Sequence, residues 1–165
     1  MYLTAGDPSV AATRDQILRL AGGGADIVEL GVPFSDPLAD GRVNQEAAMR
    51  ALAAGATLGR ILEMIAGLRR KTQVPIVIYS YINPLLAHGL ETSIRKMAQA
   101  GVDGLLVLDL AAEEAEEPVA LMRRHGIAPI RLVTPTSTDK RVERIAKQAD
   151  GFIYCVSRAG VTGAR

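Results

Sequence analysis

Short apolar runs, rich in β-branched residues, constrain the fold of this chain more than any other feature. They recur mostly every 25 residues or so along the 165-residue sequence, at residues 2–4, 27–30, 76–81, 105–109, 130–133 and 152–156. Most lack the alternation of apolar and polar residues that marks a strand with one solvated face. Because parallel strands are covered on both faces, these runs predict the strands of a parallel sheet.

Amphipathic stretches separate the runs and predict helices. The segment 58–70 places five apolar residues on one helical face: Leu58, Ile61, Leu62, Ile65 and Leu68. A second helical pattern, at 47–52, lies in the same unusually long interval between two strands. A third begins with acidic residues at Glu113 and ends with basic residues before Gly126, which matches the polarity of a helix dipole. Strands and helices therefore alternate, as in α/β proteins.

Two architectures fit this alternation: a doubly wound open sheet and a TIM (β/α)8 barrel. A complete barrel takes about 250 residues, so six strands in 165 residues correspond to part of one. The sequence begins at a strand and ends after a Gly-rich loop, without a helix to cover its last strand. We therefore expect an α/β fold, an incomplete TIM barrel of about six βα units, as a single partial domain over residues 1–165.

Composition excludes several classes of function. The formal net charge is +1 with both signs interspersed, which favours neither nucleic acid nor an anionic membrane as a partner. The single cysteine, Cys155, cannot form an internal disulfide, and we expect it to be a small buried core residue. No apolar run approaches the roughly 20 residues of a membrane helix, and no signal peptide is visible. We expect a cytoplasmic location.

Glu29 is the most informative residue, because it lies inside an apolar strand between Val28 and Leu30. Burial raises the pKa of a carboxyl group, and it is costly unless the group is paired or protonated. Such a group near the carboxyl end of a barrel strand suits acid–base catalysis near neutral pH. An internal ion pair with Arg131, the one obvious basic residue in a strand, fits the sequence equally well.

The loop 31–41 carries two further acids, Asp36 and Asp40, on either side of Pro37. Loops that follow strands build the active sites of barrels. However, Asp before Pro or Gly is also a common turn former, so a purely local role fits as well. A metal site made from these two acids and Glu46 lacks further ligands, and we expect no metal.

Other residues with potential chemistry have ordinary explanations in the sequence alone. Tyr79, Tyr81 and Tyr154 lie in predicted strands, where packing with a hydrogen-bonded hydroxyl is the default interpretation. The Gly-rich loop 160–163 could hold a phosphate on its backbone N–H groups. Neither histidine has a paired nucleophile, so nothing supports a Ser-His-Asp or Cys-His mechanism.

Together these motifs resemble the tryptophan synthase α subunit family. The segment 28–41, Val-Glu-Leu-Gly-Val-Pro-Phe-Ser-Asp-Pro-Leu-Ala-Asp-Gly, is similar to the family signature essentially in full. Supporting matches occur at residues 2–8, 81–84, 101–109 and 157–163, so the resemblance covers nearly the whole chain. It favours the barrel over the open sheet. It also implies that the family's N-terminal helix and its seventh and eighth strands lie outside these residues.

The family cleaves indole-3-glycerol phosphate to indole and glyceraldehyde 3-phosphate, by a retro-aldol reaction without a cofactor, late in tryptophan biosynthesis. The resemblance implies that Glu29 moves the protons, that Asp40 accepts the indole N–H, and that Tyr154 lies near the catalytic glutamate. Four further residues match substrate-binding positions of the family: Tyr2, Tyr81, Thr162 and Gly163.

In the family the indole passes to a β subunit that carries pyridoxal phosphate, within an α-β-β-α complex. The resemblance implies that the loop with Asp36 and Pro37 lies toward this partner. This chain departs from the family pattern at Arg42 and Ala111, where proline is usual. Two other functions remain open: a catalytically inactive module that only binds or activates a β subunit, and another barrel enzyme of phosphorylated sugars, such as an isomerase.

Overall fold

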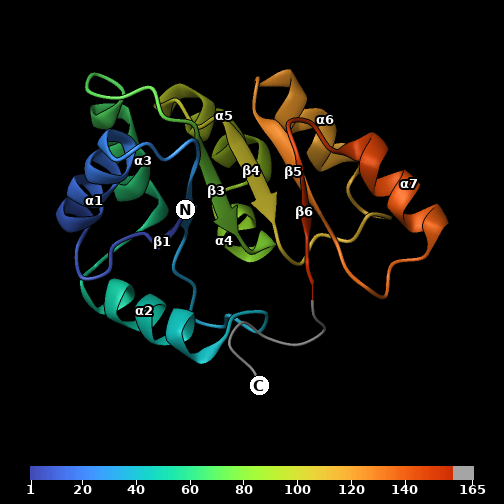
Figure 1. Ribbon diagram of the computed structural model, residues 1–165, viewed down its shortest axis with the longest axis horizontal. Coiled ribbons are helices and arrows are strands. Elements are labelled where there is room, and N and C mark those ends of the chain that lie inside the picture. The colour runs from blue at the N-terminus through green and yellow to red at the C-terminus, as the bar shows by residue number, and fades with distance from the viewer. Residues whose placement is uncertain (158–165) are drawn as a thin grey trace.

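Six parallel strands form one sheet in the computed structural model, which describes residues 1–157 (Figure 1). The strands are β1 (Tyr2–Thr4), β2 (Val28–Gly31), β3 (Ile76–Ser80), β4 (Gly104–Val107), β5 (Ala128–Val133) and β6 (Ile153–Cys155). The helices are α1 (Val10–Gly22), α2 (Arg42–Ala53), α3 (Leu58–Leu68), α4 (Ile82–Leu86), α5 (Leu90–Ala100), α6 (Glu116–Arg124) and α7 (Asp139–Gln148). The strands lie in chain order from β1 to β6, whereas a doubly wound sheet reverses its order. The structure therefore confirms a partial barrel.

Strand register assigns the residues to the two faces of the sheet. Tyr2, Glu29 and Val77 are aligned partners across β1, β2 and β3, so their side chains point to one face, called here the inner face. Ile78 and Leu105 are aligned on the opposite face, called here the outer face. Both are fully buried in the main hydrophobic core. The outer face is therefore the one that the helices cover.

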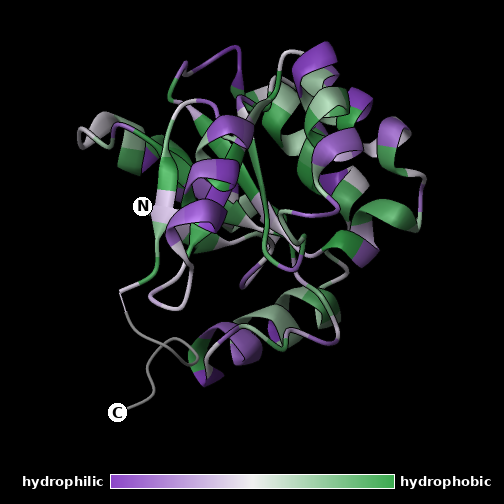
Figure 2. Ribbon diagram, turned by 90° about the vertical axis from the view of Figure 1, so that its right-hand side faces the viewer, coloured by the Kyte–Doolittle hydropathy of each residue, from purple (hydrophilic) through white to green (hydrophobic). Residues whose placement is uncertain are grey.

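Helices α1, α3, α5 and α6 supply most of the rest of this core, and Leu85 of α4 adds to it. All five apolar residues predicted to share a face of α3 are buried, which confirms that prediction. Figure 2 shows hydrophobic and hydrophilic stretches alternating along the helices, as expected when one side of each is buried. The second helix predicted in the long interval is also present, as α2. It lies beyond the carboxyl ends of the strands in both views.

Arg69, the residue that ends α3, joins the loops at the amino ends of β3 and β4. Its Nε donates to the carbonyl oxygen of Gly101 at 2.8 Å, and its Nη1 donates to that of Val74 at 2.7 Å. Its Nη2 pairs with the carboxylate of Asp103, which also accepts the backbone N–H of Ile76 at 2.8 Å. Gly101 has a φ of +89°, and a Cβ there would press on the Arg69 side chain, so this position requires glycine.

Two sequence-based expectations are wrong in detail, and one helix was not foreseen. The helix α6 begins at Glu116 rather than at Glu113, because residues 112–114 form a separate turn in which the Glu114 N–H donates to the Ala111 carbonyl oxygen. The Glu113 carboxylate pairs with two arginines of α7. Cys155 is exposed rather than buried, since β6 pairs only with β5 among the described residues. The short helix α4 follows β3 directly and carries only one fully buried side chain, Leu85, so its apolar pattern is weak.

No single helix in residues 1–157 is long and apolar enough to cross a membrane. Helices α2 and α3 pass the same test of length and composition only as a pair, and they are bent by 91° relative to each other.

Candidate active site

Glu29 lies within β2 and presents a half-buried carboxyl group on the inner face. Burial raises the pKa of Glu29, and the positively charged amino group of Met1 opposes this rise. None of the ion pairs and side-chain hydrogen bonds among residues 1–157 involves this carboxylate. A carboxyl group with a raised pKa and no fixed partner is able to exchange protons with a ligand near neutral pH.

The proposed ion pair between Glu29 and Arg131 is wrong, because the two side chains lie on opposite faces of the sheet. Ile130 and Leu132, on either side of Arg131 in β5, both pack in the inner-face cluster. Since successive residues of a strand alternate, Arg131 points to the outer face. There its Nη2 donates to the carbonyl oxygen of Leu110 at 3.0 Å.

Three tyrosines surround the inner face near Glu29. The ring centroids of Tyr2 and Tyr79 are 5.3 Å apart at an interplanar angle of 75°, an edge-to-face contact. Burial raises the pKa of Tyr154, and the nearby Glu29 carboxylate raises it further. Gly31 leaves room for the Tyr2 side chain, because a Cβ at residue 31 would overlap the Tyr2 hydroxyl. The inner face thus offers an aromatic surface beside the catalytic candidate.

Asp40 is only 6% exposed and is held in place by its neighbours. The Tyr81 hydroxyl donates to Asp40 Oδ2 at 2.9 Å, and it accepts the backbone N–H of Ala39 at 2.9 Å. The Asn44 side chain lies 3.5 Å from Asp40 Oδ1, and Gln45 Nε2 donates to the Asp40 carbonyl oxygen at 2.9 Å. Burial and the bond to Asp40 raise the pKa of Tyr81, so it remains a hydroxyl donor.

Tyr2 lies close enough to both Glu29 and Asp40 to be affected by their charges. Burial raises the pKa of its hydroxyl most strongly, and the negative charges of Asp40 and of Glu29 both raise it further. Both acids therefore act on one aromatic ring from β1. The structure brings together Glu29, Asp40, Tyr2, Tyr81 and Tyr154, the candidates that lie within the described residues.

Asp36 and Pro37 lie in the loop between β2 and α2, on the surface rather than in the site. Asp36 Oδ2 accepts a hydrogen bond from the Ser35 hydroxyl at 2.8 Å. Leu38, which follows Pro37, is 86% exposed. Glu46 pairs with Arg42 at 2.7 Å instead of meeting these acids. No metal-binding group of three or more His, Cys, Asp or Glu side chains forms among residues 1–157.

Thr162 and Gly163, with the rest of the Gly-rich loop, lie outside the described residues.

Two residues that do line the site were missed in the sequence. Tyr79 was assigned to packing, although its parity in β3 places it on the same face as Val77. Gln45 lies five residues after Asp40, in the first turn of α2, and its side-chain amide donates to the Asp40 carbonyl oxygen. Strand parity and the helix period were the available signals.

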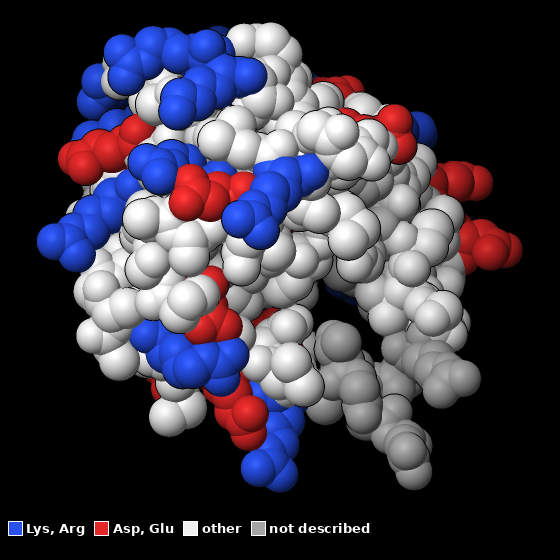
Figure 3. All heavy atoms as spheres, turned by 60° about the vertical axis from the view of Figure 1, so that its left-hand side comes forward, with Lys and Arg blue, Asp and Glu red and all other residues white. Residues whose placement is uncertain are grey.

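The uncharged surface is extensive on the face that Figure 3 shows, and basic and acidic side chains lie interspersed around it. The expectation of a balanced surface charge therefore holds on this face, which has no single field of one sign.

The sequence profile described as tryptophan synthase alpha chain matches residues 1–165. Among curated relatives, the tryptophan synthase alpha chain of Geobacter sulfurreducens is 56% identical over 164 residues, which are 99% of this chain and 62% of that protein. That of Geotalea daltonii is 51% identical, again with 99% and 62% covered. This chain thus spans about three fifths of the length of these relatives.

Solved structures agree with the sequence comparison. The alpha subunit of Legionella pneumophila tryptophan synthase superposes with a TM-score of 0.91 at 37% identity, covering 94% of this chain and 60% of that one. A chain of the tryptophan synthase complex from Pyrococcus furiosus gives a TM-score of 0.89 at 38% identity, covering 93% and 64%. Because the family profile matches every residue from 1 to 165, this chain belongs to the tryptophan synthase alpha chain family.

Proposed function

We propose that the polypeptide to which these residues belong is a lyase that cleaves indole-3-glycerol phosphate to indole and glyceraldehyde 3-phosphate. The family membership and the arrangement of Glu29 and Asp40 beside an aromatic face support this function. The reaction needs a proton at indole C3, tolerance of positive charge at the ring nitrogen, and removal of a proton from the adjacent hydroxyl group. Residues 1–165 would be part of a single barrel domain.

One observation carries the proposal: Glu29 is a half-buried carboxyl group with a raised pKa and no fixed partner, on the inner face. A raised pKa keeps a larger fraction of Glu29 protonated near neutral pH, so it can deliver a proton to indole C3. The resulting carboxylate can then take the proton of the hydroxyl group. One carboxyl group thereby serves both proton transfers. The carbon–carbon bond breaks as the hydroxyl proton leaves, so that the carbonyl group of glyceraldehyde 3-phosphate forms and the electron pair of the broken bond restores the indole ring.

Asp40 would accept the indole N–H and stabilise the positive charge as the ring is protonated. The Tyr81 hydroxyl holds Oδ2 of this carboxylate at 2.9 Å, so the negative charge is oriented before substrate arrives. Tyr2 and Tyr81 would contact the indole, and Tyr154 would lie beside Glu29. Thr162 would bond Asp40 when the site closes, and Gly163 would donate a backbone N–H to the phosphate.

We also propose a β subunit as the partner, in an α-β-β-α complex, with the loop of Asp36 and Pro37 turned toward it. The exposed apolar side chains of Leu38 (86%) and Val43 (77%) follow these two residues and suit a protein interface. The proposed reaction uses no cofactor of its own, and pyridoxal phosphate would belong to the partner. The proposed location is the cytoplasm.

The test is indole release by the complete natural polypeptide with Glu29 replaced by Gln. We expect kcat to fall by at least about 100-fold, the lower range for the loss of a general acid–base group. Glu63→Gln is the matched control, because Glu63 is an exposed acid on α3. Equal rates for the Glu29→Gln variant and the wild type would refute the assigned role.

The same assay separates the other two functions. A polypeptide that releases no indole but raises the rate of a β subunit would be a binding module only. Turnover of a sugar phosphate without turnover of indole-3-glycerol phosphate would indicate an isomerase or a related barrel enzyme.

A further inference from the structure

Arg131 is a buried cation that lacks a counter-charge. It is 5% exposed, and its only hydrogen bond among residues 1–157 is the one from Nη2 to the Leu110 carbonyl oxygen at 3.0 Å. Its Nε is buried and makes no hydrogen bond. No ion pair among the described residues includes this guanidinium group. A buried charge is costly unless it is paired, so this arrangement is incomplete without an anion.

A cavity adjoins the Arg131 side chain. It has a volume of about 470 Å³ and lies between the loop that follows β4 and the start of α7. Three hydroxyl groups gather on its wall: Thr134 Oγ1 lies 2.9 Å from Thr136 Oγ1 and 3.2 Å from Ser137 Oγ. Hydroxyl groups rotate freely, so they can turn a donor toward a ligand. Arg141 lines the same cavity and adds a second positive charge.

Asp109 lines this cavity and Glu113 contacts its residue Arg141, and both acids have partners of their own. Asp109 Oδ1 accepts the backbone N–H of Ile82 at 2.8 Å. Glu113 is shared between Arg141, at 3.4 Å, and Arg144, at 3.6 Å. Burial lowers the pKa of Arg131, and the charge of Arg141 lowers it more than Glu113 raises it. Two cations, Arg131 and Arg141, therefore line the cavity together with one acid, Asp109.

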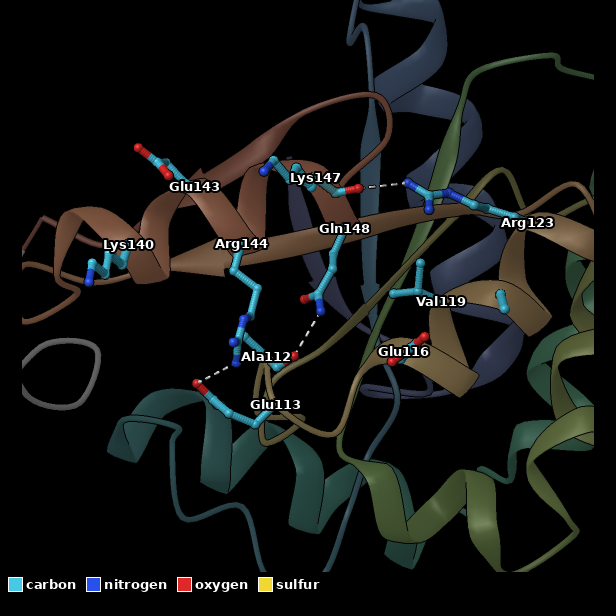
Figure 4. A pocket seen from close by; sticks show the side chains of 11 residues that line it. Ala112, Glu113, Glu116, Val119, Arg123, Lys140, Glu143, Arg144, Lys147 and Gln148 are labelled. Carbon is cyan, nitrogen blue, oxygen red and sulfur yellow. Dashed lines mark hydrogen bonds and ion pairs between the residues drawn. The ribbon is translucent and has the colours of Figure 1, made fainter.

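The neighbouring groove between α6 and α7 differs in this respect. It has a volume of about 940 Å³, and its polar groups bond across it, as Figure 4 shows. Arg123 Nη2 donates to the Lys147 carbonyl oxygen at 3.2 Å, and Gln148 Nε2 donates to that of Ala112 at 2.7 Å. Acidic and basic side chains mix along this groove, so it selects no charge. Of these two cavities within residues 1–157, the Arg131 cavity is the one that combines a buried, uncompensated charge with hydroxyl groups on its wall.

We propose that the Arg131 cavity binds a small molecule that carries a phosphate or carboxylate group. The planar guanidinium fork matches the two oxygens of either group, and the surrounding hydroxyls supply further donors. A volume of about 470 Å³ suits a small metabolite. Arg131 points to the outer face of β5, whereas Glu29 lies on the inner face of β2, and none of the candidate active-site residues lines this cavity. It is therefore separate from the site proposed for indole-3-glycerol phosphate.

A local probe tests the proposal on the complete natural polypeptide. Arginine is labelled at the guanidinium nitrogens with a stable isotope, and the Nε–H signal of Arg131 is assigned by its loss in Arg131→Lys. We expect inorganic phosphate to shift this signal with a dissociation constant of about 1 mM or tighter. Sodium acetate in a parallel titration shows whether a carboxylate is also accepted. Sodium chloride at the same ionic strength should leave the signal in place.

Thermal unfolding supplies the second measurement. Phosphate should raise the unfolding midpoint less in Arg131→Met than in the wild type, because the variant lacks the charge. Arg144→Met removes an arginine of α7 that does not line the cavity, and it should retain the full rise. The proposal is refuted if neither phosphate nor acetate shifts the Arg131 signal, or if chloride shifts it equally. The titration is read in the wild-type protein, and Arg131→Lys serves only to assign the signal, so a failure of Arg131→Met to fold does not affect it. Loss of indole release also leaves this test unchanged.

Discussion

Replacing Tyr81 by Phe removes a single oxygen atom from the candidate site. That oxygen donates to Asp40 Oδ2 and accepts the N–H of Ala39, both at 2.9 Å. The ring itself can stay in place, because it packs against Phe34 with centroids 5.3 Å apart. The substitution therefore isolates the effect of the hydroxyl group on a buried carboxylate.

The magnitude follows from what each bond is worth. A hydrogen bond to a charged group contributes about 1.5–3 kcal/mol, and Asp40 is 6% exposed, so water does not replace it easily. Asn44, at 3.5 Å, is too distant from Oδ1 to compensate. The Ala39 N–H lies in an exposed loop, where water can take the place of the hydroxyl. We expect a loss of about 2 kcal/mol in the free energy of unfolding.

Urea unfolding of Tyr81→Phe measures this loss, and Tyr79→Phe is the matched control. The Tyr79 hydroxyl makes no hydrogen bond among residues 1–157, so its removal should cost within about 0.5 kcal/mol. If orientation of Asp40 limits the proposed reaction, kcat/KM for indole release should fall about 30-fold, which corresponds to 2 kcal/mol. Equal losses of stability in the two variants would refute the assigned role of the hydroxyl.

Two further predictions concern stability. The pKa of Glu29 in the folded state is raised above its ordinary value of 4.5. Between the pKa of the unfolded state and that of the folded state, the folded protein therefore binds more protons. The free energy of unfolding falls as the pH rises through the folded-state pKa. Unfolding at a series of pH values should show the wild type losing stability relative to Glu29→Gln above about pH 4.5, and a constant difference would contradict the sign. Arg69→Met removes two bonds to carbonyl oxygens and an ion pair, so the free energy of unfolding should fall by about 2–3 kcal/mol. Arg70→Met, at the exposed neighbouring position, should change it by less than about 0.5 kcal/mol in the same urea titration. Equal losses in the two variants would show that the Arg69 contacts do not stabilise the fold.

Local pattern was enough to predict the strands and the main helices. Ile78 and Leu105 lie in apolar runs with no polar alternation, and both are fully buried against helices, as parallel strands require. Glu29 was recognised because a carboxyl group in such a run is costly to bury. Thr57 caps α3 by accepting the Arg60 N–H at 3.3 Å, so the sequence also contains the signal for where this helix begins.

Contacts between distant segments could not be predicted in the same way. Tyr81 and Asp40 are 41 residues apart, and the bond between them exists only because the loop after β2 folds over the end of β3. Sequence spacing carries no signal for such a pair. The role of Tyr79 depends on its alignment beside Gly31, where the missing side chain leaves room for the Tyr2 ring. A register is a property of two strands together, and neither strand alone specifies it.

The separation of Glu29 from Arg131 depends on strand parity. Ile130 faces inward in β5, so Arg131 must face outward. A shift of β5 by one residue would turn Arg131 inward and expel Ile130 from the inner-face cluster. A cation on the inner face would favour the charged form of Glu29 and lower its pKa, which would remove the acid form that the proposed reaction requires. The apolar packing of Ile130 therefore determines both features: a carboxyl group that remains free on one face, and a guanidinium group without a counter-charge on the other.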